Sequence, residues 1–430
     1  MQPAPPMPAP FAPRQLMPVG LFTPWILLFA YFILTLPTQW VKAVLPYYGD
    51  VVFGVIMLLV AIPYLFMRSF WRGTSMWAVG LMVYGMIVTY LTRGTEGTWA
   101  FGEREFILDI LLFLAVAFGL KLGEASFESL RTLVSRISWV CILMGSANIL
   151  LMRFGYVQID ADAGNRIVSI SLFYIISPLL FLVPLQVVFR LGLWLPILSV
   201  AMVGLVAYFT LTRSIAIAFF LLFAQLMLLL LRRAMGAFAT GFTVWLFLIL
   251  PLMILGGYIM LDSITNARGM DSIGNTSGRD LEFEAFLEQM STRGWIAGNG
   301  LGTGFLMNGF DTTGAPMKVL VTGLHYTTLT PVLKLGSVLT LFIWLALMYA
   351  SARVFFGPGD IDQKAVVLVP FNYIVVYSIS GGWLASAYLI FGVALCLLFN
   401  FRAFAESAVP ATQPNSPDGR PLLHRRHRHL

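Results

Sequence analysis

The chain has 430 residues, of which 59% are hydrophobic and only 11% are charged, and its mean hydropathy is +0.84. An average soluble domain carries about 25% charged residues, so this composition excludes an ordinary soluble protein and indicates a polytopic membrane protein. The formal net charge is +7, but the basic residues are scattered through short connections, which is typical of membrane topology and excludes a nucleic-acid groove.

The first 20 residues are rich in proline and read MQPAPPMPAPFAPRQLMPVG. Such a segment forms neither a helix nor a packed core, so residues 1–20 are predicted to be a disordered cytoplasmic lead. No small-residue cleavage site follows an apolar core of signal-peptide length. The first apolar helix is therefore expected to stay in the protein.

Continuous apolar runs follow, and each is long enough to cross the hydrocarbon core of a bilayer as a helix. Because the runs do not alternate with a period of two residues, membrane β-strands are excluded and the expected fold class is all-α. About twelve spans are predicted, at residues 21–38, 49–67, 75–92, 106–122, 131–153, 167–188, 192–211, 214–231, 238–261, 327–352, 364–380 and 383–400. Two very short separations, after residue 211 and at Gly381 and Gly382, leave the count open.

The connections after even-numbered spans carry most of the basic residues, as the positive-inside rule expects of a cytoplasmic face. The chain therefore divides into spans one to nine (21–261), a large acidic loop outside the cytoplasm (262–322), spans ten to twelve (323–400) and a basic cytoplasmic tail (401–430). Both termini are predicted to be cytoplasmic. The tail ends in HRRHRHL, which favours anionic-lipid contact or solubility over metal binding.

Cys141 and Cys396 each stand alone in an apolar run, without the spacing of metal ligands. They are interpreted as small core residues. The sequence accordingly predicts neither a metal site nor a cofactor.

Arg213 lies in TLTRSIAIAFF, between two apolar runs at the predicted outer surface. An arginine at a helix end either reaches the lipid headgroups or binds an anion, and its position alone leaves both interpretations open. The flanking threonines and serine and the short turn favour a binding site.

Arg279 opens the polar part of the large loop in the sequence TSGRD, where Ser277 can cap a short amphipathic helix. The apolar residues of that helix recur at helical spacing, at Phe283, Phe286, Leu287 and Met290. Such a helix would lie along the membrane surface, and its positive N-terminal end with Arg279 would form an anion site. The alternative is a solvated arginine paired with a neighbouring acid.

The glycine-rich stretch RGWIAGNGLGTGF follows and contains Arg293, Gly300 and Gly302. A nucleotide-binding loop is excluded, because the stretch does not belong to a βαβ unit. Either its backbone amides approach an anionic headgroup or a sugar, or it is a flexible outer loop.

His325 is the only histidine outside the last seven residues and lies at the start of the tenth predicted span. A neutral imidazole can accept a proton near neutral pH, although a lone interfacial histidine also serves structural roles. Lys334 lies two turns further on, roughly 13 Å along a helix. It either lines the site or pairs with Asp109.

Two arginines and one histidine on one predicted face suit the transfer of a group from a diphosphate to a hydroxyl. Arginine forks bind phosphate oxygens and stabilise the charge that grows as the bond breaks, while the histidine accepts the proton of the hydroxyl. The sequence offers no evident carboxylate pair, metal cluster or nucleophilic serine. A metal-independent transfer is therefore favoured over hydrolysis.

In these features the chain resembles the superfamily of O-antigen ligases and Wzy-type polysaccharide polymerases. The matching sequences are TLTR at Arg213, Ser-Gly-Arg at Arg279, GNGLGTG, and LHYTTLTPVLKLGSV at His325, in this order and over essentially the whole membrane part. The resemblance implies a GT-C-like helical fold and an enzyme that moves a glycan from undecaprenyl diphosphate to a hydroxyl at the periplasmic face of the bacterial inner membrane. It also implies that Arg213 and Arg279 hold the diphosphate and that His325 activates the acceptor, with Arg293, Lys334, Gly300 and Gly302 as accessory residues.

His325 is followed by Tyr326, where the family has a histidine-asparagine pair, and this difference favours a repeat-unit polymerase of exopolysaccharide or O-antigen. A ligase that transfers finished polymer to lipid A core is the alternative within the family. A flippase or other transporter of lipid-linked sugars is the alternative from another class, but spans nearly free of charge and without an internal repeat argue against it. A non-catalytic assembly subunit is a further alternative. The expected partners are undecaprenyl-diphosphate-linked oligosaccharides, membrane lipid, a chain-length regulator and a flippase.

Overall fold

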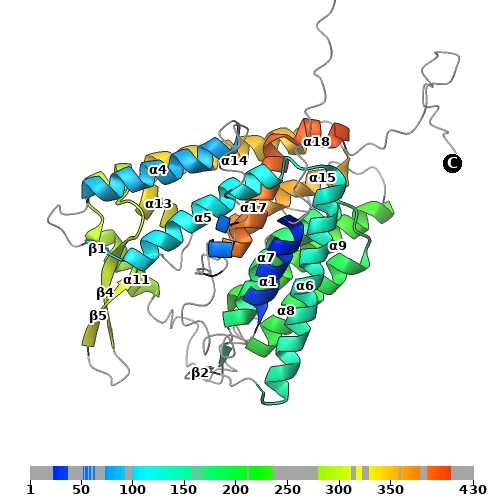
Figure 1. Cartoon of the computed structure of the whole chain (residues 1–430), viewed down its shortest axis with the longest axis horizontal. Coiled ribbons are helices and arrows are strands. Elements are labelled where there is room, and N and C mark those ends of the chain that lie inside the picture. The colour runs from blue at the N-terminus through cyan, green and yellow to red at the C-terminus, as the bar shows by residue number, and fades with distance from the viewer. Residues whose placement is uncertain are drawn as a thin grey trace, which may run out of the picture.

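A computed structural model describes residues 23–36, 73–92, 99–156, 160–162, 166–168, 170–210, 213–235, 279–310, 316–321, 329–357, 360–377 and 385–407, together with single positions between 52 and 62. This part of the chain is mainly helical and also contains two small antiparallel sheets (Figure 1). Its helices are α1 (Thr23–Thr35), α4 (Ser75–Thr92), α5 (Glu103–Leu122), α6 (Phe127–Arg153), α7 (Ile170–Val188), α8 (Trp194–Thr210), α9 (Arg213–Met235), α11 (Arg279–Gln289), α12 (Thr292–Ala297), α13 (Thr330–Leu335), α14 (Ser337–Phe356), α15 (Ile361–Lys364), the 3-10 turn η2 (Ala365–Val367), α16 (Leu368–Tyr377), α17 (Ala385–Phe399) and α18 (Phe401–Ser407).

The predicted apolar runs are mainly helical where the structure describes them, although residues 167 and 168 of the run at 167–188 belong to a strand, and α4 has the predicted bounds of 75–92. Three helices, α4, α6 and α14, are long and apolar enough to cross a membrane by length and composition. Apolar segments in α7, α8, α9 and α17 are shorter than that criterion. The run at 238–261 lies outside the described residues.

Two expectations need correction. The predicted span at 327–352 is two helices, α13 and α14, because Gly336 between them adopts a φ of 85° that ends the first helix. The fold is also not entirely helical. Strands β1 (Trp99–Phe101), β4 (Thr303–Phe310) and β5 (Pro316–Val321) form one sheet in the order β1-β4-β5, and β2 (Asp160–Asp162) pairs with β3 (Arg166–Val168).

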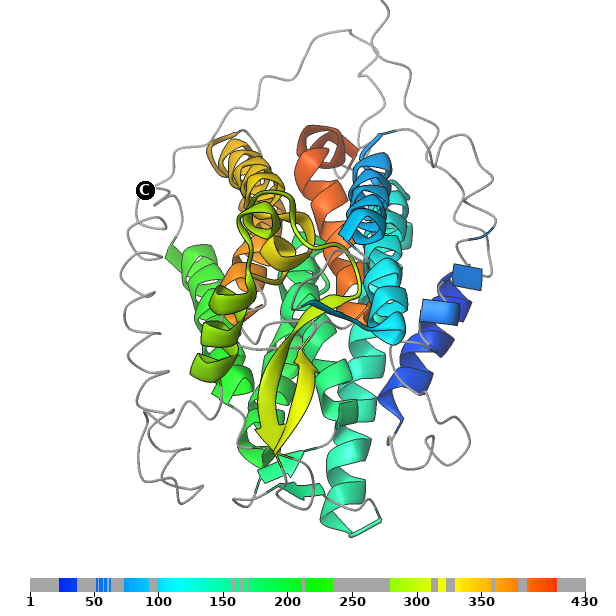
Figure 2. The ribbon, with the colours of Figure 1, turned by 90° about the vertical axis from the view of Figure 1, so that its left-hand side faces the viewer.

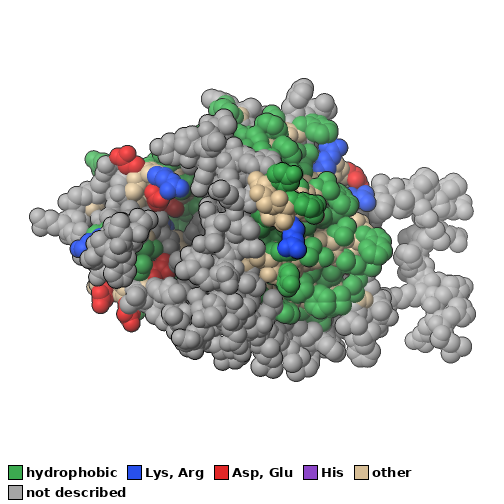
Figure 3. All heavy atoms as spheres, turned by 90° about the horizontal axis from the view of Figure 1, so that it is seen from below, with side chains coloured by type: hydrophobic (Ala, Val, Ile, Leu, Met, Phe, Trp, Pro, Cys, Tyr) green, Lys and Arg blue, Asp and Glu red, His purple; other side chains and the backbone are tan. Residues whose placement is uncertain are grey.

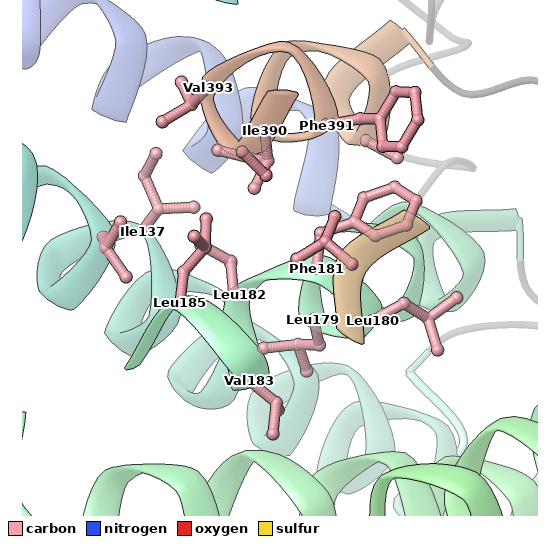
Figure 4. Packing of buried hydrophobic residues seen from close by; sticks show 14 of the residues in the cluster. Ile137, Leu179, Leu180, Phe181, Leu182, Val183, Leu185, Ile390, Phe391 and Val393 are labelled. Carbon is pink, nitrogen blue, oxygen red and sulfur yellow. The ribbon is translucent and has the colours of Figure 1, made fainter. Parts of the chain in front are cut away.

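The core of the helical part is centred on α7, which packs against α6, α8 and α17. Figure 4 shows Leu182 and Leu185 of α7 close to Ile137 of α6 and Ile390 of α17. All four side chains are at most 1% exposed. Because these helices share one apolar core, they form a single scaffold.

Helices α5 and α17 approach each other closely through glycines. A Cβ atom at Gly119 would overlap the carbonyl oxygen of Leu389, and one at Gly392 would overlap that of Val116. Small residues allow this backbone contact, which is a common way for apolar helices to associate when lipid surrounds them.

Buried polar side chains also tie the helices together. The amide Nε2 of Gln186 in α7 donates to Ser138 Oγ of α6 at 2.7 Å and to Ser199 Oγ of α8 at 2.9 Å. Asn372 of α16 donates to the carbonyl oxygen of Leu180 in α7 at 2.8 Å. Such bonds are favourable because an apolar surrounding offers no water to replace them.

The contacts at the helix ends divide the connections into two groups. Phe127, Phe189 and Phe404, which lie beside connections that follow even-numbered apolar runs, have ring centroids 5.2 to 5.9 Å apart. Arg190, from the same connection as Phe189, forms an ion pair with Asp360, from the connection after the tenth run.

The opposite helix ends form the second group. There the hydroxyl of Tyr31 near the end of α1 donates to the carbonyl oxygen of Ser386 at the start of α17. Strand β1 follows the third apolar run and pairs with β4 of the large polar interval, with Trp99 opposite Phe305. Connections that follow odd-numbered runs therefore also meet one another.

The outer surface of the helical part is apolar, with aromatic residues near helix ends. Trp77 and Tyr90, near the two ends of α4, are 78% and 81% exposed. Trp194 and Tyr208 occupy similar positions on α8 and are also exposed. In Figure 3 hydrophobic side chains cover much of the described surface on the right, while acidic side chains gather at the left-hand end. An apolar belt with aromatic ends is typical of a membrane-facing surface.

Candidate functional site

The candidate site is organised on the sheet formed by β1, β4 and β5. Strands β4 and β5 pair antiparallel from Phe305 opposite Val321 to Phe310 opposite Pro316, and β1 adds to the other edge of β4. The sheet lies at one end of the long axis of the molecule (Figure 1), and Figure 2, which looks at that end, shows the hairpin in yellow in front of the helices. The polar interval that the sequence offered as a turn or a flexible loop is thus partly a folded sheet.

Helix α11 covers this sheet. Phe286 of α11 is fully buried, and its ring lies 6.1 Å from that of Phe305 in β4 and 5.5 Å from that of Trp295 in α12. The side chain of Gln289 bonds both backbone groups of Leu306, accepting from its amide at 3.0 Å and donating to its carbonyl oxygen at 2.7 Å.

The predicted amphipathic helix is therefore present, but much of its apolar face packs on protein rather than on the membrane surface. Phe286 and Met290 are buried, whereas Leu287 is 44% exposed. The physical reason is that the sheet supplies apolar partners such as Phe305, which the sequence does not show to be near.

The same small core contains the helix that follows His325 in the chain. Val332 and Leu333 of α13 join Phe286, Met290 and Phe305 in one buried cluster, with Val321 and Leu329 packed against it. The segments that follow Arg279 and His325 in sequence thus converge on one apolar cluster, which we call the site core.

The three principal candidates lie at the edges of what the structure describes. Arg213 is the first residue of α9 and Arg279 is the first residue of α11, and in both cases the side chain lies outside the described residues. His325 lies in the interval 322–328, also outside the described residues, between Val321 at the end of β5 and Leu329 before α13. Arg293 is described and is exposed on α12.

The glycine-rich turn after α12 packs tightly against other parts of the chain. Gly300 and Gly302 have φ values of 91° and 71°, which favour glycine. A Cβ atom at Gly302 would lie 2.6 Å from Cβ and 2.8 Å from Cα of Phe106 in α5, and one at Gly300 would overlap the backbone of Thr89 in α4. The turn is therefore a packed structural element.

The backbone groups of the turn are hydrogen-bonded within the protein. The amide of Gly300 donates to the carbonyl oxygen of Lys334 at 3.0 Å, and that of Gly302 donates to Asp109 Oδ2 at 2.7 Å. The hydroxyls of Thr89 and Thr92 donate to the carbonyl oxygens of Leu301 at 3.0 Å and of Asn299 at 2.9 Å. The interpretation in which these glycine amides bind an anionic headgroup or sugar is therefore not favoured. Gly300 and Gly302 instead hold the turn on α4, α5 and α13.

Lys334 is the buried cation of this arrangement. Its Nζ atom lies 2.8 Å from Asp109 Oδ2 and donates to the carbonyl oxygen of Thr303, also at 2.8 Å. The side chain of Lys334 is 4% exposed and that of Asp109 is 16% exposed. Of the two roles left open for Lys334, the structure shows the pair with Asp109. It leaves the ammonium group little access to a substrate.

Sequence reasoning named Asp109 only as a partner of Lys334 and missed Gln289, Thr89 and Thr92 altogether. A signal existed for Asp109, because an acidic residue inside an apolar run needs a partner. The threonines carry no such signal, since their acceptors lie more than 200 positions away in the chain. Among the described residues, no group of three or more histidine, cysteine, aspartate or glutamate side chains is placed to hold a metal ion.

No protein-family model, curated protein or solved structure matches this chain.

Proposed function

We propose that the protein is a polymerase that joins undecaprenyl-diphosphate-linked oligosaccharide repeat units into a surface polysaccharide at the periplasmic face of a bacterial inner membrane. The observation that carries this proposal is the site core, because Phe286 of α11, Leu333 of α13 and Phe305 of β4 belong to one buried cluster there. Two segments far apart in sequence, one opened by Arg279 and one preceded by His325, are held together by it. A transfer between a diphosphate donor and a hydroxyl acceptor needs such residues near one another.

In the proposed reaction Arg213 and Arg279 bind the diphosphate of the donor. The acceptor hydroxyl, on the terminal sugar of another lipid-linked chain, gives its proton to His325 and attacks the anomeric carbon of the donor. The bond between that carbon and the diphosphate oxygen breaks, and undecaprenyl diphosphate leaves. The arginines stabilise the leaving group because guanidinium forks match phosphate oxygens and keep their charge.

The contacts at the helix ends support a multi-pass arrangement with alternating sides, and the basic residues of the even-numbered connections favour cytoplasmic termini. Residues near even-numbered connections contact one another, as Phe127 does with Phe189, and residues near odd-numbered connections do the same, as β1 does with β4. An alternating membrane topology produces this grouping. Under the proposed orientation, the sheet, α11 and His325 all belong to the periplasmic side, where lipid-linked repeat units are polymerised.

The proposal is tested in a strain that lacks the chromosomal copy and carries wild type, Arg279→Ala, His325→Ala or Lys318→Ala. Lys318 is an exposed lysine of β5 and serves as the matched control, because it is a cation of the same loop without a proposed role. Lipid-linked glycans are extracted and sized by mass spectrometry, together with the surface polymer, at equal protein levels. We expect Arg279→Ala and His325→Ala to accumulate single repeat units on the carrier lipid, while Lys318→Ala makes polymer of normal length.

Other outcomes of this experiment identify the alternatives. Full-length polymer that stays on the carrier lipid and is missing from lipid A core would identify a ligase. Single repeat units that stay protected from a glycosidase added to spheroplasts, and so remain on the cytoplasmic leaflet, would identify a flippase. Normal polymer in both variants would contradict a catalytic role for Arg279 and His325.

A further inference from the structure

Three segments of the chain meet at the carboxylate of Asp109. The carboxylate belongs to α5, and its Oδ2 atom contacts Lys334 Nζ of α13 and the amide of Gly302 in the turn. The ammonium group of Lys334 closes the arrangement by donating to Thr303, the first residue of β4. One buried ion pair therefore joins a long helix, a turn that leads into the sheet, and a short helix.

A buried ion pair is a poor source of net stability. The free energy needed to remove both charges from water is large, and replacing such a pair with apolar side chains of similar size is often neutral or stabilising. Removing only one partner is costly, because the other charge is then left uncompensated. The pair instead restricts geometry, because its contacts form in only one arrangement of the three segments.

The ion pair is connected to the segments next to both His325 and Arg279. Lys334 follows His325 by nine residues in the sequence and lies in α13, the first described helix after it. Thr303 begins β4, on which α11 packs through Phe286 and Phe305, and α11 begins at Arg279. A shift of the turn relative to α5 would consequently move the segments next to both residues.

We propose that the Lys334–Asp109 pair is a positioning element of the transfer site, which holds α11, which begins at Arg279, and α13, which follows His325, in a single geometry on α5. This inference rests on the proposed function. Neither Lys334 nor Asp109 touches the substrate in the proposed reaction. A misplacement of about 1 Å at a reacting group lowers a rate on the order of 100-fold, so loss of the pair should act mainly on turnover.

The first test measures the geometry without any enzymatic assay. Spin labels are placed at Arg104→Cys in α5 and Glu288→Cys in α11, both exposed positions, and the distance between them is measured by pulsed electron resonance in the full-length protein in detergent or nanodiscs. The native cysteines Cys141 and Cys396 are buried, and the parent protein serves as the blank for labelling. Lys334→Met should broaden or shift the distance distribution relative to wild type.

The matched control is Lys364→Met. Lys364 is also a lysine that donates to a backbone carbonyl, that of Phe355 at 3.2 Å, but it is only half-buried and lies in the connection between α14 and α16. Lys364→Met should leave the distance distribution between the spin labels as it is in wild type. A distribution for Lys334→Met that matches wild type in mean and width would overturn the proposal, whatever the polymer assays show.

The second test separates positioning from folding. The double variant Lys334→Met with Asp109→Leu removes both charges, so it should recover most of the thermal stability that Lys334→Met alone loses. It still lacks the bonds to Gly302 and Thr303, so its turnover on extracted lipid-linked repeat units should stay on the order of 100-fold below wild type, with the KM for the donor little changed. Full turnover in a stable double variant would show that the pair only stabilises the fold and would overturn the proposal.

Failure of the proposed function gives a different result. If wild type does not extend lipid-linked repeat units, that function is wrong. The spin-label distances then still report whether the pair fixes α11 on α5. The two failures are thus distinguishable.

Discussion

Gly302 adopts a φ of 71° and lies against Phe106, while its amide is bonded to Asp109. Both properties matter, since the conformation disfavours any residue with a Cβ atom and the neighbouring helix leaves no room for one. From the sequence the glycines of this stretch could equally indicate an anion-binding turn or a flexible loop. The structure favours neither interpretation, because the amides of Gly300 and Gly302 donate hydrogen bonds within the protein.

A pair of glycine variants separates conformation from packing. Gly155 has a φ of 75°, but nothing lies within 4 Å of a Cβ atom placed there. Gly155→Ala should therefore cost only the conformational term, about 1–2 kcal/mol of unfolding free energy. Gly302→Ala should cost clearly more, because Phe106 must also move. Thermal unfolding in detergent measures both, and equal melting temperatures for the two variants would contradict the packing described for the turn.

A lysine substitution separates the contribution of the positive charge of Arg279 from that of its planar guanidinium group. Lysine keeps the positive charge but lacks the planar fork that binds two phosphate oxygens at once. We expect Arg279→Lys to retain less than about a tenth of wild-type chain extension, since a bidentate contact to a charged group is worth roughly 1.5–3 kcal/mol. Initial rates with lipid-linked repeat units measure this, with Lys318→Arg as the control. Wild-type rates in Arg279→Lys would show that charge alone suffices.

At the scale of the elements, long apolar runs predicted helices well. The run at 75–92 is helix α4 with the same bounds. A continuous apolar run predicts such a helix without knowledge of the segments that it packs against. The sheet was not predicted, because β4 pairs with β1, which lies about 200 positions earlier in the chain. The sequence of β4, TGFLMNGF, does not indicate that partner. The break at Gly336 was missed for a similar reason. This glycine lies against the backbone of Ile296, and the contact exists only in the folded chain.

The packing of α5 on α17 gives a prediction at this scale. Gly119→Ala should destabilise the protein, because its Cβ atom would overlap the backbone of Leu389 in the facing helix. Gly80→Ala in α4 is the matched control, since nothing lies within 4 Å of the added atom. It should be neutral or stabilising by about 1 kcal/mol, because alanine is the better helix former. If Gly119→Ala melted at or above the temperature of Gly80→Ala, the close contact of α5 with α17 would be wrong.

On the scale of the whole molecule, the contacts sort the connections into two groups at opposite helix ends. The proposed topology places the group of Arg131 and Arg190 in the cytoplasm and the group of the sheet and α11 in the periplasm. The basic residues of the sequence predict which group faces the cytoplasm, because the charge beside a membrane span depends on the side of the membrane and not on tertiary contacts. How the helices pack in the bundle could not be predicted, since apolar runs alike in composition do not specify their partners.

Cysteine labelling tests this topology directly. A membrane-impermeant maleimide should label Glu288→Cys in cells with a permeabilised outer membrane and an intact inner membrane, because α11 is proposed to face the periplasm. It should label Arg131→Cys, at an exposed position of α6, only after the inner membrane is also opened. The buried Cys141 and Cys396 should stay unlabelled in both conditions. Labelling of Arg131→Cys in intact spheroplasts would reverse the proposed orientation.

Purified protein, reconstituted in liposomes and supplied with undecaprenyl-diphosphate-linked repeat units from the deletion strain, gives the decisive test of polymerisation. We expect a ladder of lipid-linked products that differ by one repeat unit, with release of undecaprenyl diphosphate, no added nucleotide sugar and no ladder from His325→Ala. Repeat units that remain single with wild-type protein, in liposomes where folding and orientation have been verified, would contradict the proposed function.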